Sequence, residues 1–139
     1  MEYIAKNIKD SLRFARKISQ RIQPGDVIGF VGDLGTGKTT IIKEIAKNLG
    51  IMENVASPTF VIYKKYATDK KCDLVHVDAY RLSRNSEIIT QEILTNKEKN
   101  MVIIEWADNI DLPSESVIIA IKYDDKNKNK RIINYETIH

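Results

Sequence analysis

Residues 27–50 read VIGFVGDLGTGKTTIIKEIAKNLG, and the fold class follows from them. The run VIGFV at 27–31 is apolar on both faces, as expected of a central strand in a parallel sheet. A glycine-rich loop follows, and then Ile41, Ile42, Ile45 and Leu49 recur at helical spacing before Gly50. This strand, loop and helix predict the first unit of an α/β domain.

The loop GDLGTGKT at 32–39 matches the P-loop pattern GxxxxGK[ST] in full. Its glycines permit backbone angles closed to other residues, so that a concave row of N–H groups faces the phosphates. We expect Lys38 to reach the β- and γ-phosphates and the Thr39 hydroxyl to ligate Mg²⁺. A dinucleotide fingerprint does not fit, because Thr40 stands where its last glycine belongs. The expected nucleotide-binding residues are Gly32, Asp33, Leu34, Gly35, Thr36, Gly37, Lys38, Thr39 and Thr40.

The remaining apolar patterns predict elements on both sides of this unit. They are two helices (8–22 and 85–94) and five strands (59–66, 72–78, 101–105, 116–123 and 131–138). Short polar turns make the first two of these strands an antiparallel pair and the last two a C-terminal hairpin. The sequence therefore predicts a three-layer P-loop NTPase fold, with a mixed sheet that is parallel at its centre and antiparallel in its additions.

The composition limits the domain count and the compartment. The chain has 139 residues, 42% hydrophobic and 29% charged, with a net charge of +3, so we expect one domain over 1–139. The mild positive charge permits a nucleic-acid neighbour without arguing for one. Cys72 is the sole cysteine, which suits a reducing compartment, and no stretch reads as a signal or membrane span. We expect a cytoplasmic protein with no membrane partner.

The motifs of a Ras-like GTPase are missing downstream of the loop. Asp78 is followed by Ala-Tyr-Arg instead of completing D-x-x-G, and residues 96–99 read NKEK where guanine recognition needs N-K-x-D. ATP is therefore the favoured nucleotide.

Two carboxylates end apolar strands, Asp78 in LVHVD and Glu105 in MVIIE. Because strand C-termini face the ligand crevice of an open α/β sheet, both are candidates for the magnesium shell and for orienting the attacking water. The sequence does not decide which carboxylate has which role, and either residue would instead cap a turn in a purely structural reading.

Three further positions have less specific interpretations. Ser57 and Thr59, in SPTF at 57–60, offer hydroxyls for a segment that senses the γ-phosphate, unless this is a plain strand-entry turn. His76 is interpreted as a hydrogen-bonded strand histidine rather than a proton carrier. Trp106 is interpreted as a core residue or an anchor for a partner.

Four motifs in this order resemble the TsaE family, the small P-loop ATPases of bacterial tRNA threonylcarbamoyladenosine biosynthesis. The motifs are GDLGTGKTT at 32–40, SPTF at 57–60, HVDAYRL at 76–82 and IEW at 104–106. By this resemblance Lys38 and the loop amides hold ATP, while Thr39 and Glu105 serve Mg²⁺. The resemblance also implies that Asp78 acts in hydrolysis or switching and that Trp106 accompanies the glutamate.

The resemblance carries further implications for the loops and partners. Ser57 and Thr59 would belong to a nucleotide-sensing loop, and Arg131 would approach the nucleotide from the hairpin. Members of the family bind a TsaD–TsaB pair, which transfers a threonylcarbamoyl group to an adenosine beside the tRNA anticodon, so contact with tRNA would be indirect. The chain departs from the family at Ala107, where a proline is frequent, and in 83–100, where a common glycine is missing.

Three activities remain open at this point. The first is a partner-coupled ATPase that is slow alone, because no arginine finger is evident and lack of one costs ~10³–10⁵ in rate. The second is a small-molecule kinase, although the chain has no insertion of the size of a kinase lid. The third is a nucleotide-binding adaptor that does not hydrolyse ATP.

Overall fold

A computed structural model of the chain describes residues 1–33, 35–56, 63–82, 91, 95 and 97–136. It contains a seven-stranded sheet in the order β1-β7-β6-β2-β5-β4-β3. The strands are β1 (Glu2–Ala5), β2 (Val27–Val31), β3 (Tyr63–Ala67), β4 (Asp73–Asp78), β5 (Asn100–Glu105), β6 (Val117–Tyr123) and β7 (Arg131–Tyr135). The helices are α1 (Ile8–Arg21) and α2 (Lys38–Asn48), with 3₁₀ turns η1 (Lys97–Lys99) and η2 (Ala107–Asn109).

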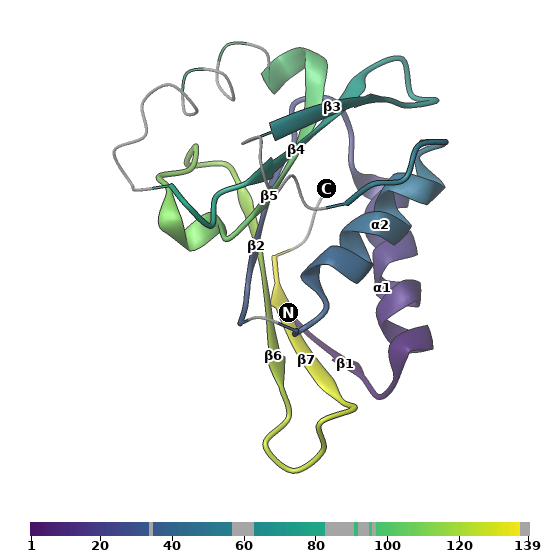
Figure 1. Cartoon of the computed structure of the whole chain (residues 1–139), viewed down its shortest axis with the longest axis vertical. Helices are drawn as coiled ribbons and strands as arrows, with labels where there is room; N and C mark the ends of the chain where they lie inside the picture. Colours follow the sequence, from purple (N-terminus) through teal and green to yellow (C-terminus); the bar gives the residue numbers. More distant parts are fainter. Residues whose placement is uncertain (34, 57–62, 83–90, 92–94, 96, 137–139) are drawn as a thin grey trace.

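The sheet is mixed, as the sequence predicts. Strand β2 pairs in parallel with both β5 and β6, and β4 pairs in parallel with β5. The pairs β3–β4, β6–β7 and β1–β7 are antiparallel. The carboxyl ends of β2, β4 and β5 consequently meet at one edge, where the glycine-rich loop leaves β2 (Figure 1).

Helices α1 and α2 lie on the same face of the sheet (Figure 1). The apolar face of α2 packs there with Phe14 and Ile18 of α1, and all four of its predicted inward residues are buried. Gly50 follows the helix with φ +80°, a left-handed conformation that ends helices. This core holds α2 against the sheet and so fixes the position of its N-terminus.

The opposite face of β2, β4 and β5 is covered by the segment after β5. Val27, Val75 and Ile104 pack there with Ala107 and Ile110. The approach is close, because a Cβ built on Gly29 would lie 2.6 Å from the Cβ of Ala107. The helix predicted over 85–94, which would form the third layer, lies largely outside the described residues.

Strand boundaries differ from the prediction at several ends. No pattern in the sequence predicts β1, a short edge strand that pairs antiparallel with β7. Strand β3 is described from Tyr63, since 57–62 are outside the described residues, and β7 ends at Tyr135 rather than at 138. In the described part of the chain, every helix is too short or too polar to span a membrane.

Candidate functional site

The loop between β2 and α2 forms an anion cradle. Gly35 and Gly37 have φ of +78° and +102°, left-handed values that strain any other residue type. Gly37 is the N-cap of α2 and provides no side-chain cap, so the positive end of the helix dipole faces the loop without a capping side chain. The buried Thr36 hydroxyl donates to the carbonyl of Asp33 at 2.8 Å and closes the turn. Leu34 lies outside the described residues.

Lys38 folds back onto this loop. Its side chain is 5% exposed, and Nζ donates to the carbonyls of Gly32 and Asp33, the latter at 3.0 Å. Burial lowers the pKa of Lys38 below its ordinary value of 10.5, while the nearby carboxylates of Glu105 and Asp33 oppose that shift. An anion in the cradle would compete with these carbonyls for the ammonium group.

Trp106 covers the same ammonium group from the end of β5. Nζ of Lys38 lies 4.0 Å from the centroid of the indole ring, within cation–π range. The backbone of Trp106 is left-handed, with φ 57°. The exposed Tyr80 packs edge-on against its indole ring, with 5.0 Å between the ring centroids. The tryptophan therefore packs partly against the core, as one sequence interpretation has it, and also contacts Lys38 beside the glycine-rich loop, which neither interpretation included.

A second cluster joins α2 to the sheet. The Thr39 hydroxyl donates to Oε1 of Glu105 at 2.9 Å, and His76 Nε2 lies 2.8 Å from Oε2 of the same carboxylate. Glu105 is 3% exposed and His76 is fully buried. The structure thus brings together Thr39 and Glu105, two of the three residues predicted to serve magnesium.

Asp78 is the register partner of Glu105 on the neighbouring strand. Since it lies two residues after His76, it is on the same face of the sheet. Its Oδ1 accepts a hydrogen bond from the backbone N–H of Tyr80 at 3.0 Å, so the carboxylate also caps the turn after β4. Both sequence interpretations of Asp78 are compatible with this geometry.

The oxygen atoms of Thr39 and Glu105 could hold a magnesium ion. No group of three or more His, Cys, Asp or Glu residues suited to a metal occurs among the residues that the structure describes. Mg²⁺ is usually bound through one or two carboxylates together with substrate phosphates and water, rather than in an all-protein cage. A hydroxyl and a carboxylate 2.9 Å apart beside the cradle fit this donor set.

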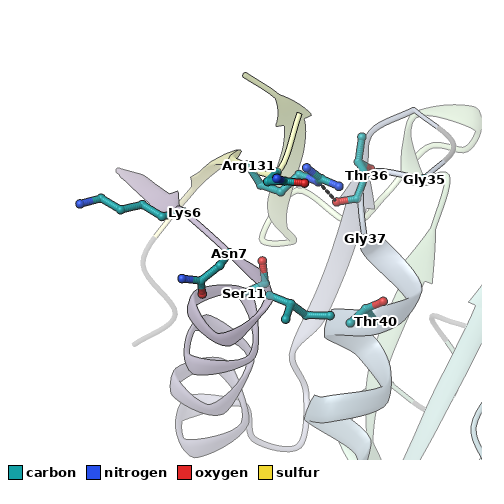
Figure 2. Close-up of a pocket in the computed structure, with 10 residues that line it drawn as sticks. Lys6, Asn7, Ser11, Gly35, Thr36, Gly37, Thr40 and Arg131 are labelled. Atoms are coloured by element: carbon teal, nitrogen blue, oxygen red, sulfur yellow. Dashed lines mark hydrogen bonds between the residues drawn. The ribbon is translucent and has the colours of Figure 1, made fainter. Parts of the chain in front are cut away.

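The C-terminal hairpin holds the loop from the other side. Arg131 Nε donates to the carbonyl of Thr36 at 3.0 Å, as Figure 2 shows, and the Tyr123 hydroxyl donates to that of Gly35 at 2.6 Å. The guanidinium of Arg131 also lies 4.2 Å from the centroid of the Tyr123 ring. Arg131, predicted from the resemblance to approach the nucleotide, thus contacts the backbone of the loop.

A cavity of about 470 Å³ opens between the loop, the start of α1 and the hairpin (Figure 2). Its charged lining residues, Lys6 and Arg131, are both basic. Ile8, 64% exposed, presents an apolar side chain at the same place. The other lining residues are Asn7, Ser11, Gly35, Thr36, Gly37, Thr40 and Asn129.

Most of the predicted site residues lie around the N-terminus of α2. Ser57 and Thr59 lie outside the described residues, and their assignment stays a prediction. His76 is a hydrogen-bonded strand histidine, as the sequence analysis interprets it, but its partner Glu105 was not predicted, and the contact of Tyr123 was missed. A signal existed for His76, because it precedes Asp78 by two residues and shares its face of the strand.

A buried strand, a glycine cradle and a lysine–threonine pair at the start of a helix define a protein of the P-loop NTPase type. A family model described as "Threonylcarbamoyl adenosine biosynthesis protein TsaE" matches residues 5–133. The chain belongs to this family.

Individual relatives agree with the family match. The chain is 38% identical over 118 residues to the "tRNA threonylcarbamoyladenosine biosynthesis protein TsaE" of Bacillus subtilis, covering 84% of this chain and 73% of that protein. It is 36% identical over 133 residues to the protein of that name from Aquifex aeolicus, and the match covers 93% of this chain and 92% of that protein. A crystal structure of Bacillus subtilis YdiB superimposes with a TM-score of 0.74 at 27% identity, covering 100% of this chain and 86% of that one.

Proposed function

We propose that the chain is a magnesium-dependent ATPase subunit that supports the N6-threonylcarbamoyladenosine modification of tRNA. It would act in the cytoplasm through a TsaD–TsaB-type complex and would meet tRNA only through that complex. The observation that carries the ATPase assignment is the contact of Thr39 with Glu105 directly beside the Lys38 cradle. The pathway rests on membership of the TsaE family and on the names of the relatives.

The cradle supplies the interactions that a triphosphate needs. The N–H groups at the start of α2 and the positive end of its dipole bind the phosphate oxygens. Lys38 leaves the carbonyls of Gly32 and Asp33 and neutralises the β- and γ-phosphates. Since burial already disfavours its charge, a phosphate partner would restore a favourable environment for the ammonium group.

The basic cavity beside the loop is suited to the nucleoside half of ATP. It adjoins Gly37 and Thr40, so a chain of phosphates in the cradle would lead into it (Figure 2). Ile8 offers an apolar surface for the base, and Asn7 and Ser11 offer polar groups for the sugar.

Thr39 and Glu105 would hold magnesium, which when bound neutralises charge developing on the phosphates. Asp78, one strand away on the same face, would orient an attacking water, a role that Glu105 shares in our proposal. Arg131 is engaged with the backbone of Thr36. We therefore expect the cationic group that accelerates hydrolysis to come from the partner.

Steady-state phosphate release, with and without a purified TsaD–TsaB pair, tests this function. The proposal predicts slow release by the chain alone and a rate at least about tenfold higher with the pair. Equal rates would rule out the coupling. Release of a phosphorylated metabolite in place of inorganic phosphate would indicate a kinase.

A further inference from the structure

His76 is an unusual residue for its place in the sheet. It lies in the middle of β4 between Val75 and Val77, and its side chain is fully buried. Nε2 is 2.8 Å from Oε2 of Glu105, whereas Nδ1 has no hydrogen-bond partner in the described part of the chain. Burial of a half-satisfied imidazole is unfavourable, and an aliphatic residue would avoid that cost. Packing alone therefore does not explain a histidine here.

The contact with Glu105 provides an explanation. An ionised carboxylate only accepts hydrogen bonds, so Nε2 carries the hydrogen and donates it to Oε2. The other oxygen, Oε1, accepts from the Thr39 hydroxyl at 2.9 Å. The carboxylate is consequently held from two sides, by a strand on one side and by the first turn of α2 on the other.

Sheet register fixes this arrangement. His76 is paired with Ile103 and Asp78 with Glu105 across the parallel β4–β5 ladder, so the histidine reaches the glutamate diagonally. The hydrogen bond from the ring holds Oε2 on the side of β4, while Oε1 lies against Thr39. A metal ligand oriented by a hydrogen bond from a neighbouring side chain is a common device in metal sites.

We propose that His76 is a positioning residue, which holds the Glu105 carboxylate toward Thr39 and thereby sets the affinity of the site for a divalent cation. This inference rests on the proposed ATPase function. Nothing in it requires His76 to contact the nucleotide or to transfer a proton.

The test compares His76→Phe with His76→Gln. Phenylalanine keeps a buried ring but removes the donor, whereas the glutamine amide restores an N–H near the position of Nε2. The affinity for Mn²⁺ is measured by electron paramagnetic resonance in the presence of a non-hydrolysable ATP analogue. We expect His76→Phe to weaken Mn²⁺ binding by about tenfold or more and His76→Gln to recover most of it. Affinity for the analogue without metal should stay within about twofold in both variants.

Wild-type Mn²⁺ affinity in His76→Phe would overturn the inference, as would an equal loss in both variants. Both of these results leave the proposed function standing, provided that the wild type binds the analogue. If the wild type binds no analogue, the proposed function fails and this inference fails with it.

A measurement on the wild-type fold covers the case in which His76→Phe does not fold. Imidazole nitrogen NMR should show hydrogen on Nε2 of His76, and Glu105→Gln should shift that resonance because it replaces the accepting carboxylate. A His76 signal that carries its hydrogen on Nδ1, or that is unaffected by Glu105→Gln, contradicts the proposal.

Discussion

Lys38 and Trp106 form a contact that binding of ATP, as we propose it, would have to rearrange. The ammonium group lies 4.0 Å from the indole centroid and is bonded to two loop carbonyls, so it cannot simultaneously extend into the cradle. The tryptophan thus reports on the position of the lysine. It is also the sole tryptophan of the chain, so its emission needs no deconvolution.

We therefore predict that ATP changes the fluorescence of Trp106 in a saturable way. The change arises because the ammonium group leaves the ring when it moves to the phosphates. Titration with ATP should give the same Kd by fluorescence as by calorimetry. In the control Tyr66→Phe, a substitution on β3 in the hydrophobic cluster that does not include Trp106, the signal should be unchanged. ATP binding by calorimetry without any change in emission would show that Lys38 stays on the indole.

Sequence spacing was sufficient for the residues of the cradle but not for their neighbours. The P-loop pattern alone predicts Lys38 and Thr39 at the start of the helix after the loop, where the structure has them, because this pattern is local. The contacts of His76 and Trp106 depend on strand register and on a left-handed residue after β5. Neither feature has a local signature, so the sequence predicts a hydrogen bond for His76 without naming its partner, and it links Trp106 to the glutamate only through the family resemblance.

At the scale of elements, the C-terminal hairpin supports the loop from outside the P-loop motif. Strands β6 and β7 bring Tyr123 and Arg131 to the carbonyls of Gly35 and Thr36. A hairpin that stiffens the cradle reduces the ordering cost of phosphate binding.

We predict that Arg131→Ala weakens ATP binding about three- to tenfold, as expected for the loss of one net hydrogen bond. Arg131→Lys should restore little, since lysine keeps the charge but lacks the Nε donor that reaches Thr36. Calorimetric Kd values decide this, with the exposed Lys128→Ala as the control for charge on the hairpin turn. Full rescue by lysine would mean that Arg131 acts on the nucleotide through its charge.

The contact between β2 and η2 leads to a second prediction at this scale. Gly29→Ala should lower the free energy of unfolding by about 1–3 kcal/mol, because its Cβ would overlap Ala107 and Leu112. Urea denaturation measures this change. Gly25→Ala is the control: nothing lies within 4 Å of its Cβ, so only the strain of a left-handed residue, about 1 kcal/mol, is expected. Wild-type stability of Gly29→Ala would mean that η2 is not packed closely on β2.

Elements with strong periodicity could be predicted and the short ones could not. Strand β2, helix α2 and the hairpin appeared in the sequence because their apolar patterns are continuous. Strand β1 has four residues, and its partner β7 lies more than 120 residues later in the sequence. No local pattern therefore predicts it. The turn around Ala107, where the family often has proline, is a 3₁₀ turn here and retains the close packing on Gly29.

At the scale of the whole molecule, the chain ends are coupled to the site. β1 lies beside β7, and the hairpin that includes β7 holds the loop between β2 and α2. The loop between β2 and α2, the C-terminal hairpin and the edge strand β1 are therefore connected through one sheet, so we expect them to unfold together. The expected single domain over 1–139 remains a prediction, and unfolding tests it.

We predict one cooperative transition. Far-UV circular dichroism reports on the whole sheet and Trp106 emission on the site, and their urea unfolding curves should coincide if one unit unfolds. ATP with Mg²⁺ should shift both midpoints upward together by linkage. Two separated transitions would show that the site unfolds independently of the sheet.

The central claim is that the loop ahead of α2 binds a triphosphate with Lys38. Titration calorimetry with ATP and Mg²⁺ tests it most directly, on the wild type, on Lys38→Ala and on Lys43→Ala, which removes an exposed lysine from the same helix. Loss of charge-assisted hydrogen bonds worth about 1.5–3 kcal/mol predicts a Kd roughly 10- to 100-fold higher for Lys38→Ala and an unchanged Kd for Lys43→Ala. Absence of heat with the wild type, or equal affinity of Lys38→Ala, would contradict the account.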